Sequence, residues 1–128
     1  MVQRQPRRVL VVHEDVLIGF FIEGFLSSIS IDVVGMKFRV GDAIAALNRS
    51  GFDFAVIDID LIGERAEELL DMLANRGTGF ALVSECGKEG IPERYRYHAY
   101  LEWSSSVHDL RQVLVPAIQH HQQETAGV

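Results

Sequence analysis

Short apolar runs alternate with longer segments of helical periodicity along most of the chain. The apolar runs are Arg8–Val12, Ile31–Met36, Asp53–Asp58, Phe80–Val83 and Ala99–Leu101. Apolar positions recur at helical spacing in residues 16–28, 41–50, 64–75 and 107–120. Apolar strands that alternate with helices are typical of a parallel sheet covered on both faces. We therefore predict an α/β domain, a three-layer doubly wound fold with a five-stranded parallel sheet.

Local signals refine the boundaries of these segments. Asp15 is placed to cap the first helix, and one of Ser104, Ser105 or Ser106 to cap the last. Gly87, Gly90 and Pro92 oppose a regular helix, so we predict a short or irregular helix over 87–97. Pro116 is expected to kink the last helix or fray its last turn, and the polar residues 122–128 to form a frayed tail.

Composition narrows the class of protein. The 128 residues suit a single domain, residues 1–128, with a core at about 8–121 between two tails. The formal charge of −6 argues against nucleic-acid binding, because an acidic domain repels phosphates. No run of about 18 apolar residues is present, so no membrane span is expected. The one cysteine, Cys86, excludes an internal disulfide and favours the cytoplasm.

Polar residues gather where the predicted strands end. The first strand is followed by His13, Glu14 and Asp15, and the third ends in Asp58 with Asp60 close behind. The ends of the fourth and fifth strands carry Ser84, Glu85, Cys86, Glu102 and Trp103. In open parallel sheets the site lies at the carboxyl ends of the strands. Carboxylates brought together there need a cation or a basic side chain, and magnesium prefers such oxygen ligands.

These motifs resemble the receiver domain of response regulators from about Arg8 to Ile118. The matching stretches are Val9-Leu10-Val11-Val12-His13-Glu14-Asp15, the segment 52–61 around Asp58, Ala81-Leu82-Val83-Ser84, and Ala99-Tyr100-Leu101-Glu102-Trp103-Ser104. The resemblance implies a flavodoxin-like sheet in the order 2-1-3-4-5.

The resemblance also implies roles for individual residues. Asp58 falls at the phospho-acceptor position, where a carboxylate oxygen is the nucleophile. Ser84 would bind a phosphoryl oxygen, and Tyr100 matches the switch aromatic, although a buried core tyrosine explains Tyr100 equally well. The magnesium ligands would be Glu14, Asp58 and the backbone carbonyl of Asp60, with His13 in the outer shell.

Several of these positions depart from the receiver pattern. Glu14 is one methylene longer than the usual aspartate, and His13 replaces an acid, so magnesium binding stays open. Trp103 stands where receivers carry the lysine that pairs with phosphate, and is either a plug over the site or an interface aromatic. A replacement cation would have to come from Lys37, Arg39 or Lys88. We therefore predict that Asp58 is phosphorylated slowly or not at all.

The resemblance implies a signalling role without enzymatic turnover. A stand-alone receiver would take a phosphoryl group at Asp58 from a sensor histidine kinase or phosphotransfer protein and act on a downstream protein partner. The alternative is a phosphorylation-independent pseudo-receiver that acts as an interaction module. Tyr95, Tyr97 and Trp103 would suit an interface, a homodimer included. A small hydrolase or cofactor-binding domain is a remote alternative, because no Gly-rich loop or nucleophile elbow is present.

Overall fold

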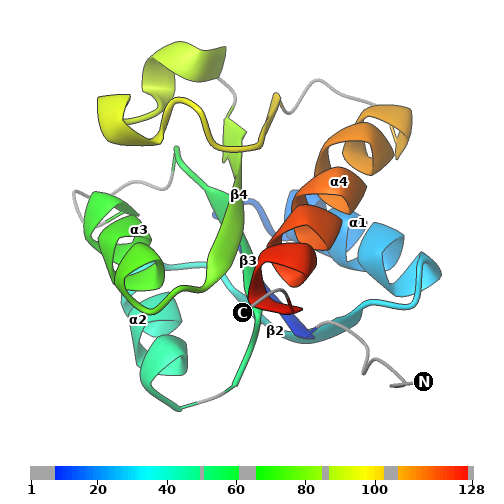
Figure 1. Ribbon diagram of the computed structural model, residues 1–128, viewed down its shortest axis with the longest axis horizontal. Helices are drawn as coiled ribbons and strands as arrows, with labels where there is room; N and C mark the ends of the chain where they lie inside the picture. The colour runs from blue at the N-terminus through cyan, green and yellow to red at the C-terminus, as the bar shows by residue number, and fades with distance from the viewer. Residues whose placement is uncertain (1–7, 50, 61–65, 85–86, 103–106, 127–128) are drawn as a thin grey trace.

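Five parallel strands form one sheet in the computed structural model, in the order β2-β1-β3-β4-β5 (Figure 1). The structure describes residues 8–49, 51–60, 66–84, 87–102 and 107–126. The strands are β1 Arg8–Val12, β2 Asp32–Lys37, β3 Phe54–Asp58, β4 Gly79–Ser84 and β5 Tyr100–Glu102. The helices are α1 Val16–Ser28, α2 Val40–Arg49, α3 Ala66–Asn75 and α4 Val107–Ala126. The predicted fold class and strand order are confirmed.

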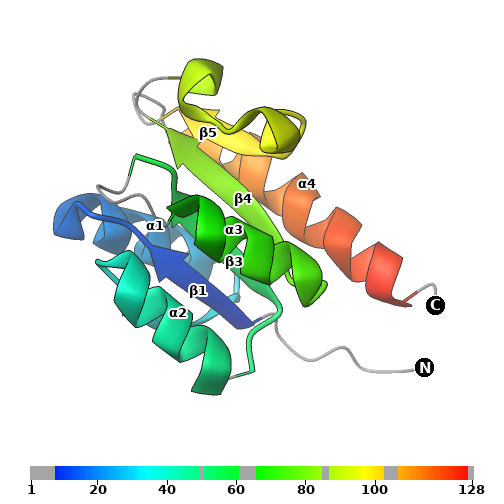
Figure 2. The same ribbon diagram turned by 90° about the vertical axis from the view of Figure 1, so that its left-hand side faces the viewer.

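Alternate side chains of the buried strands supply two cores, one on each face of the sheet. Val9 and Val11 pack with buried residues of α1 and α4 on one face. Leu10 and Val12 pack with buried residues of α2 and α3 on the other. Figure 2 shows the two layers on either side of the sheet. The unbroken apolar strands follow from this arrangement, because both faces of each central strand are covered.

The segment between β4 and β5 contains two short 3₁₀ helices, η1 Gly87–Gly90 and η2 Glu93–Tyr95, in place of a regular helix. The predicted irregularity over 87–97 is confirmed. Polar contacts tie η2 to α3: the Arg94 guanidinium and the Tyr95 hydroxyl both donate to the Asp71 carboxylate. These bonds, with that from Tyr95 the largest cause, lower the pKa of Asp71. The contacts fix a segment that has little helical propensity of its own.

The last helix is longer than predicted. It continues through Ala126, whereas the sequence favoured an end near His120 and a frayed tail beyond it. Pro116 lies inside the helix. A proline removes one backbone hydrogen bond locally but leaves the later bonds intact, and the glutamines and glutamate that follow are good helix formers. The predicted serine caps at 104–106, and the start of α3 near Glu64, lie outside the described residues.

Within the part of the chain that the structure describes, no helix combines the length and apolarity needed to cross a bilayer.

Candidate functional site

The predicted site lies at the carboxyl ends of β1 and β3, which are neighbours in the sheet. Asp58 is the last residue of β3, and only 4% of its surface is exposed. A pocket of about 310 Å³ opens here, and its lining is His13, Glu14, Asp15, Asp58 and Asp60. The structure therefore brings together the residues that the sequence placed after the first and third strands.

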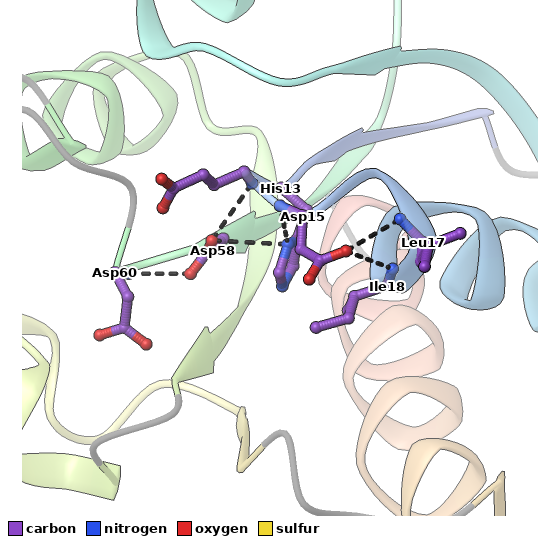
Figure 3. A network of polar contacts seen from close by, with 7 residues as sticks. His13, Asp15, Leu17, Ile18, Asp58 and Asp60 are labelled. Atoms are coloured by element: carbon purple, nitrogen blue, oxygen red, sulfur yellow. Dashed lines mark hydrogen bonds and ion pairs between the residues drawn. The ribbon is translucent and has the colours of Figure 1, made fainter.

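Both carboxylate oxygens of Asp58 accept hydrogen bonds from backbone N–H groups (Figure 3). Asp60 N–H donates to Oδ1 at 2.9 Å, and Glu14 N–H donates to Oδ2 at 3.3 Å. The Nδ1 atom of His13 lies 3.5 Å from the same Oδ2. The loops after β1 and β3 thus hold the Asp58 carboxyl from two sides.

His13 is buried beneath this carboxyl. Its backbone N–H donates to the carbonyl of Lys37 at the end of β2, which continues the sheet hydrogen bonding by one residue. Its Nδ1 accepts the N–H of Asp15 at 3.0 Å, and the Asp15 carboxylate in turn accepts from Leu17 and Ile18 in the first turn of α1. His13 therefore links the Asp58 carboxyl to the beginning of α1.

The pKa of Asp58 is raised above its usual value, chiefly because burial penalises the charged form. His13 and the two backbone N–H donors oppose this effect, while the nearby Asp60 carboxylate adds to it. The balance still favours the protonated acid more than in a solvated aspartate.

The arrangement does not fit a magnesium ion. Among the described residues, no group of three His, Cys, Asp or Glu side chains is arranged to hold a metal. Asp58 turns both oxygens to backbone donors, the Glu14 side chain is exposed, and Asp60 presents its N–H to Asp58. Magnesium needs several oxygens in near-ideal octahedral geometry.

The remaining predicted site residues are distributed around this centre. Ser84 is fully buried at the end of β4, one residue beyond Val83, which pairs with Asp58. Tyr100 is half-buried and packs against the core under α2 and α3. Trp103, Glu85 and Cys86 lie outside the described residues, as does the side chain of Lys88.

No lysine or arginine of the described residues, Lys37 and Arg39 included, forms an ion pair with Asp58. The ionisable partner that the structure does place beside the carboxyl is His13. From the sequence, His13 was predicted only as an outer-shell metal ligand, and its packing against Asp58 was not predicted. The contact joins residues 45 positions apart, and only the pairing of β1 with β3 brings them together.

Comparisons with known proteins bear on the fold. No family model matches the chain, and no curated protein matches it either. Solved structures do match. SdrG from Sphingomonas melonis Fr1 is 24% identical with a TM-score of 0.77, over 88% of this chain and 97% of SdrG. A CheY-like response regulator receiver domain protein from Methanospirillum hungatei JF-1 is 18% identical with a TM-score of 0.79, over 94% and 99%.

A third match is the isolated REC domain of RcsB from Salmonella enterica serovar Typhimurium, solved with the phosphomimetic BeF₃⁻. It is 13% identical with a TM-score of 0.75, over 91% of this chain and 90% of that domain. The sheet order, the helix layers and these matches agree with one another: the chain has the fold of response-regulator receiver domains.

Proposed function

We propose that this chain is a receiver module of two-component phosphorelay signalling, and that it signals through a protein contact without needing phosphate on Asp58. The single observation that supports the second part is the enclosure of the Asp58 carboxyl by Glu14 N–H, Asp60 N–H and His13. Its partners would be a sensor histidine kinase or phosphotransfer protein and a downstream protein. The lone cysteine is compatible with the cytoplasm, where we place the protein.

The physical reason concerns the charge that develops during phosphoryl transfer. Positive groups must face the equatorial oxygens of the transferred group. Among the described residues the base beside Asp58 is His13, and an imidazole whose Nδ1 accepts the Asp15 N–H carries no charge. Trp103, at the usual lysine position by sequence, carries no charge. The loss of one such contact costs about 2–4 kcal/mol in the transition state. That cost slows the reaction by roughly 30- to 1,000-fold.

A phospho-accepting receiver is the second candidate, and one observation favours it. The pocket of about 310 Å³ opens directly on Asp58 at the carboxyl end of β3, where a receiver takes its phosphoryl group. In this form a kinase or phosphotransfer protein would load Asp58, and His13 would have to supply the missing positive charge.

The two candidates differ in how the purified chain responds to magnesium and a small phosphodonor such as acetyl phosphate. We expect no mass gain of about 80 Da, or a slow and incomplete one, in intact-mass spectrometry. The triple variant His13→Asp, Glu14→Asp, Trp103→Lys should label faster, because it restores two acids for the metal and one cation for the phosphate.

Asp58→Asn in the triple variant is the matched control, and it should abolish the gain. BeF₃⁻, which was present with the REC domain of RcsB, serves as a non-covalent probe: we expect amide shifts around Asp58 in the triple variant and none in the natural chain. Rapid, stoichiometric, magnesium-dependent labelling of the natural chain would reject the phosphate-independent form and establish the second candidate.

A further inference from the structure

The side of α1 that faces away from the sheet is apolar where a surface helix is usually polar. Val16 is 44% exposed, Leu17 79%, Phe20 52% and Phe21 43%. The opposite side of α1 packs on the sheet through Ile22, Phe25 and Leu26, beside α4 (Figure 1). A helix that is apolar on both sides indicates a second surface to bury.

This outward face changes character halfway along the helix. The large residues lie in its first half, and the exposed positions of its second half are Gly24, Ser27 and Ser28. Gly24 has no atom within 4 Å of the place where a Cβ would lie. The outward face therefore carries large side chains in the first half of the helix and small ones in the second half. The segments Val16 to Phe21 and Gly24 to Ser28 contain no charged residue.

We propose that this face is a dimer interface, in which α1 packs antiparallel against α1 of a second copy. A two-fold axis near Ile22 and Glu23 would place Leu17 of each copy over Ser28 of the other. It would also place each Phe21 over the partner's Gly24, so that Leu17 and Phe21, two of the bulky residues, each meet a small one. The antiparallel arrangement sets the positive end of one helix dipole beside the negative end of the other.

The absence of charge at these positions and the size of the patch allow a second copy as the occupant. Two chains of charge −6 repel each other, and an uncharged surface is where they can approach most closely. Two half-exposed phenylalanines offer roughly 200 Å² to bury. With Leu17 and Val16 the patch reaches roughly 400 Å² per copy, as large as the functional patches of many monomers.

Two copies with the small residues included would bury about 1,000 Å², which is the minimum for a biological interface. The dimer should therefore be weak and reversible. The interface uses neither Asp58 nor its chemistry, so it stands independently of the function proposed above.

Sedimentation velocity of the full chain from about 5 to 500 µM tests the dimer. We expect the average mass to rise from 14.3 kDa toward twice that value. Gly24→Gln should raise the Kd at least about tenfold, because its side chain fills the space meant for the partner's Phe21. The same substitution should leave the melting temperature unchanged or higher, since the site is open in the single copy and glycine is a poor helix former.

Tyr97→Ser is the matched control, because Tyr97 is the fully exposed aromatic outside α1 among the described residues. It should leave the Kd unchanged. The packing direction is tested by mild oxidation in a Cys86→Ser background: Leu17→Cys with Ser28→Cys should cross-link, and Leu17→Cys alone should not. A monomer at every concentration, a dimer that Gly24→Gln leaves intact, or binding of this face to a different protein without self-association would each overturn the proposal.

Discussion

Asp58 lies at the centre of the candidate site, and its carboxyl is enclosed by neighbouring groups. Two backbone N–H groups and the buried His13 surround the carboxyl, and burial raises its pKa. His13 replaces an acid with a group that can share or carry a proton. The contact between His13 and Asp58 supports the proposal of signalling without phosphate.

The pKa of Asp58 offers a direct test of this environment. We expect ¹³C-detected titration to place it above 3.8, its ordinary value, because burial outweighs the favourable contacts. His13→Asn should raise it further, since His13 opposes the shift. Asp60→Asn should lower it, since the Asp60 charge adds to the shift. Shifts of the same sign in both variants would contradict this account.

The sign of the linked effect on stability follows from the raised pKa. The folded state holds the Asp58 proton to a higher pH than the unfolded state does. The contribution of this group to the free energy of unfolding therefore decreases as pH rises from 3.8 through the folded pKa.

At the scale of elements, α1 connects the site to the proposed dimer face. Its first turn is capped by the Asp15 carboxylate, which accepts from Leu17 N–H and Ile18 N–H, while Asp15 N–H donates to His13. The helix has no acidic residue in its first turn and no basic residue in its last. The cap is therefore the main local electrostatic support of α1.

Removal of this cap should destabilise the fold measurably. Asp15→Ala is expected to lower the free energy of unfolding by about 1 kcal/mol, because two N–H groups lose their acceptor. Asp15→Asn keeps an acceptor oxygen and should retain most of the stability. Urea unfolding of the three proteins measures both differences. Equal stability of Asp15→Ala and the natural chain would show that the cap contributes nothing.

At the scale of the whole molecule, the sheet separates two hydrophobic cores that are covered by different elements. The core under α2 and α3 extends to Ile91 and Tyr95 and is closed by the segment between β4 and β5. Among the described residues, α1 and α4 cover the other core, and α1 exposes large apolar residues beyond it. The layer formed by α2 and α3 therefore differs from the layer formed by α1 and α4, because α1 leaves large apolar side chains exposed that a second surface could bury.

This difference predicts a large loss of unfolding free energy for one leucine and a small loss for another on the same side of the sheet. Leu114→Ala removes a fully buried side chain of α4 and should cost about 2–5 kcal/mol of unfolding free energy. Leu17→Ala removes an exposed one and should cost less than about 0.5 kcal/mol in dilute solution. Chemical denaturation at low protein concentration gives both values. A large loss in Leu17→Ala under those conditions would place Leu17 in the core of the single copy.

The sequence by itself determined the elements of this protein. Unbroken apolar runs predicted buried parallel strands, Asp15 predicted the beginning of α1, and Gly87, Gly90 and Pro92 predicted the interrupted segment before β5. These features depend on residues close together in the chain, whose propensities act locally. The extent of α4 beyond His120 was mispredicted, because the apolar periodicity that predicted the helix ends at Ile118 and the residues that follow are polar.

Only the tertiary structure decided what the site can do. The pairing of β1 with β3 sets His13 and Glu14 N–H against Asp58, and burial by the surrounding layers sets its pKa. Likewise, the pattern of α1 is apolar on nearly every side, and the packing of Ile22, Phe25 and Leu26 on the sheet decides which residues remain outside. Burial, and contacts between residues that are distant in the sequence, arise only when the layers of the fold assemble. A local sequence pattern therefore cannot predict them.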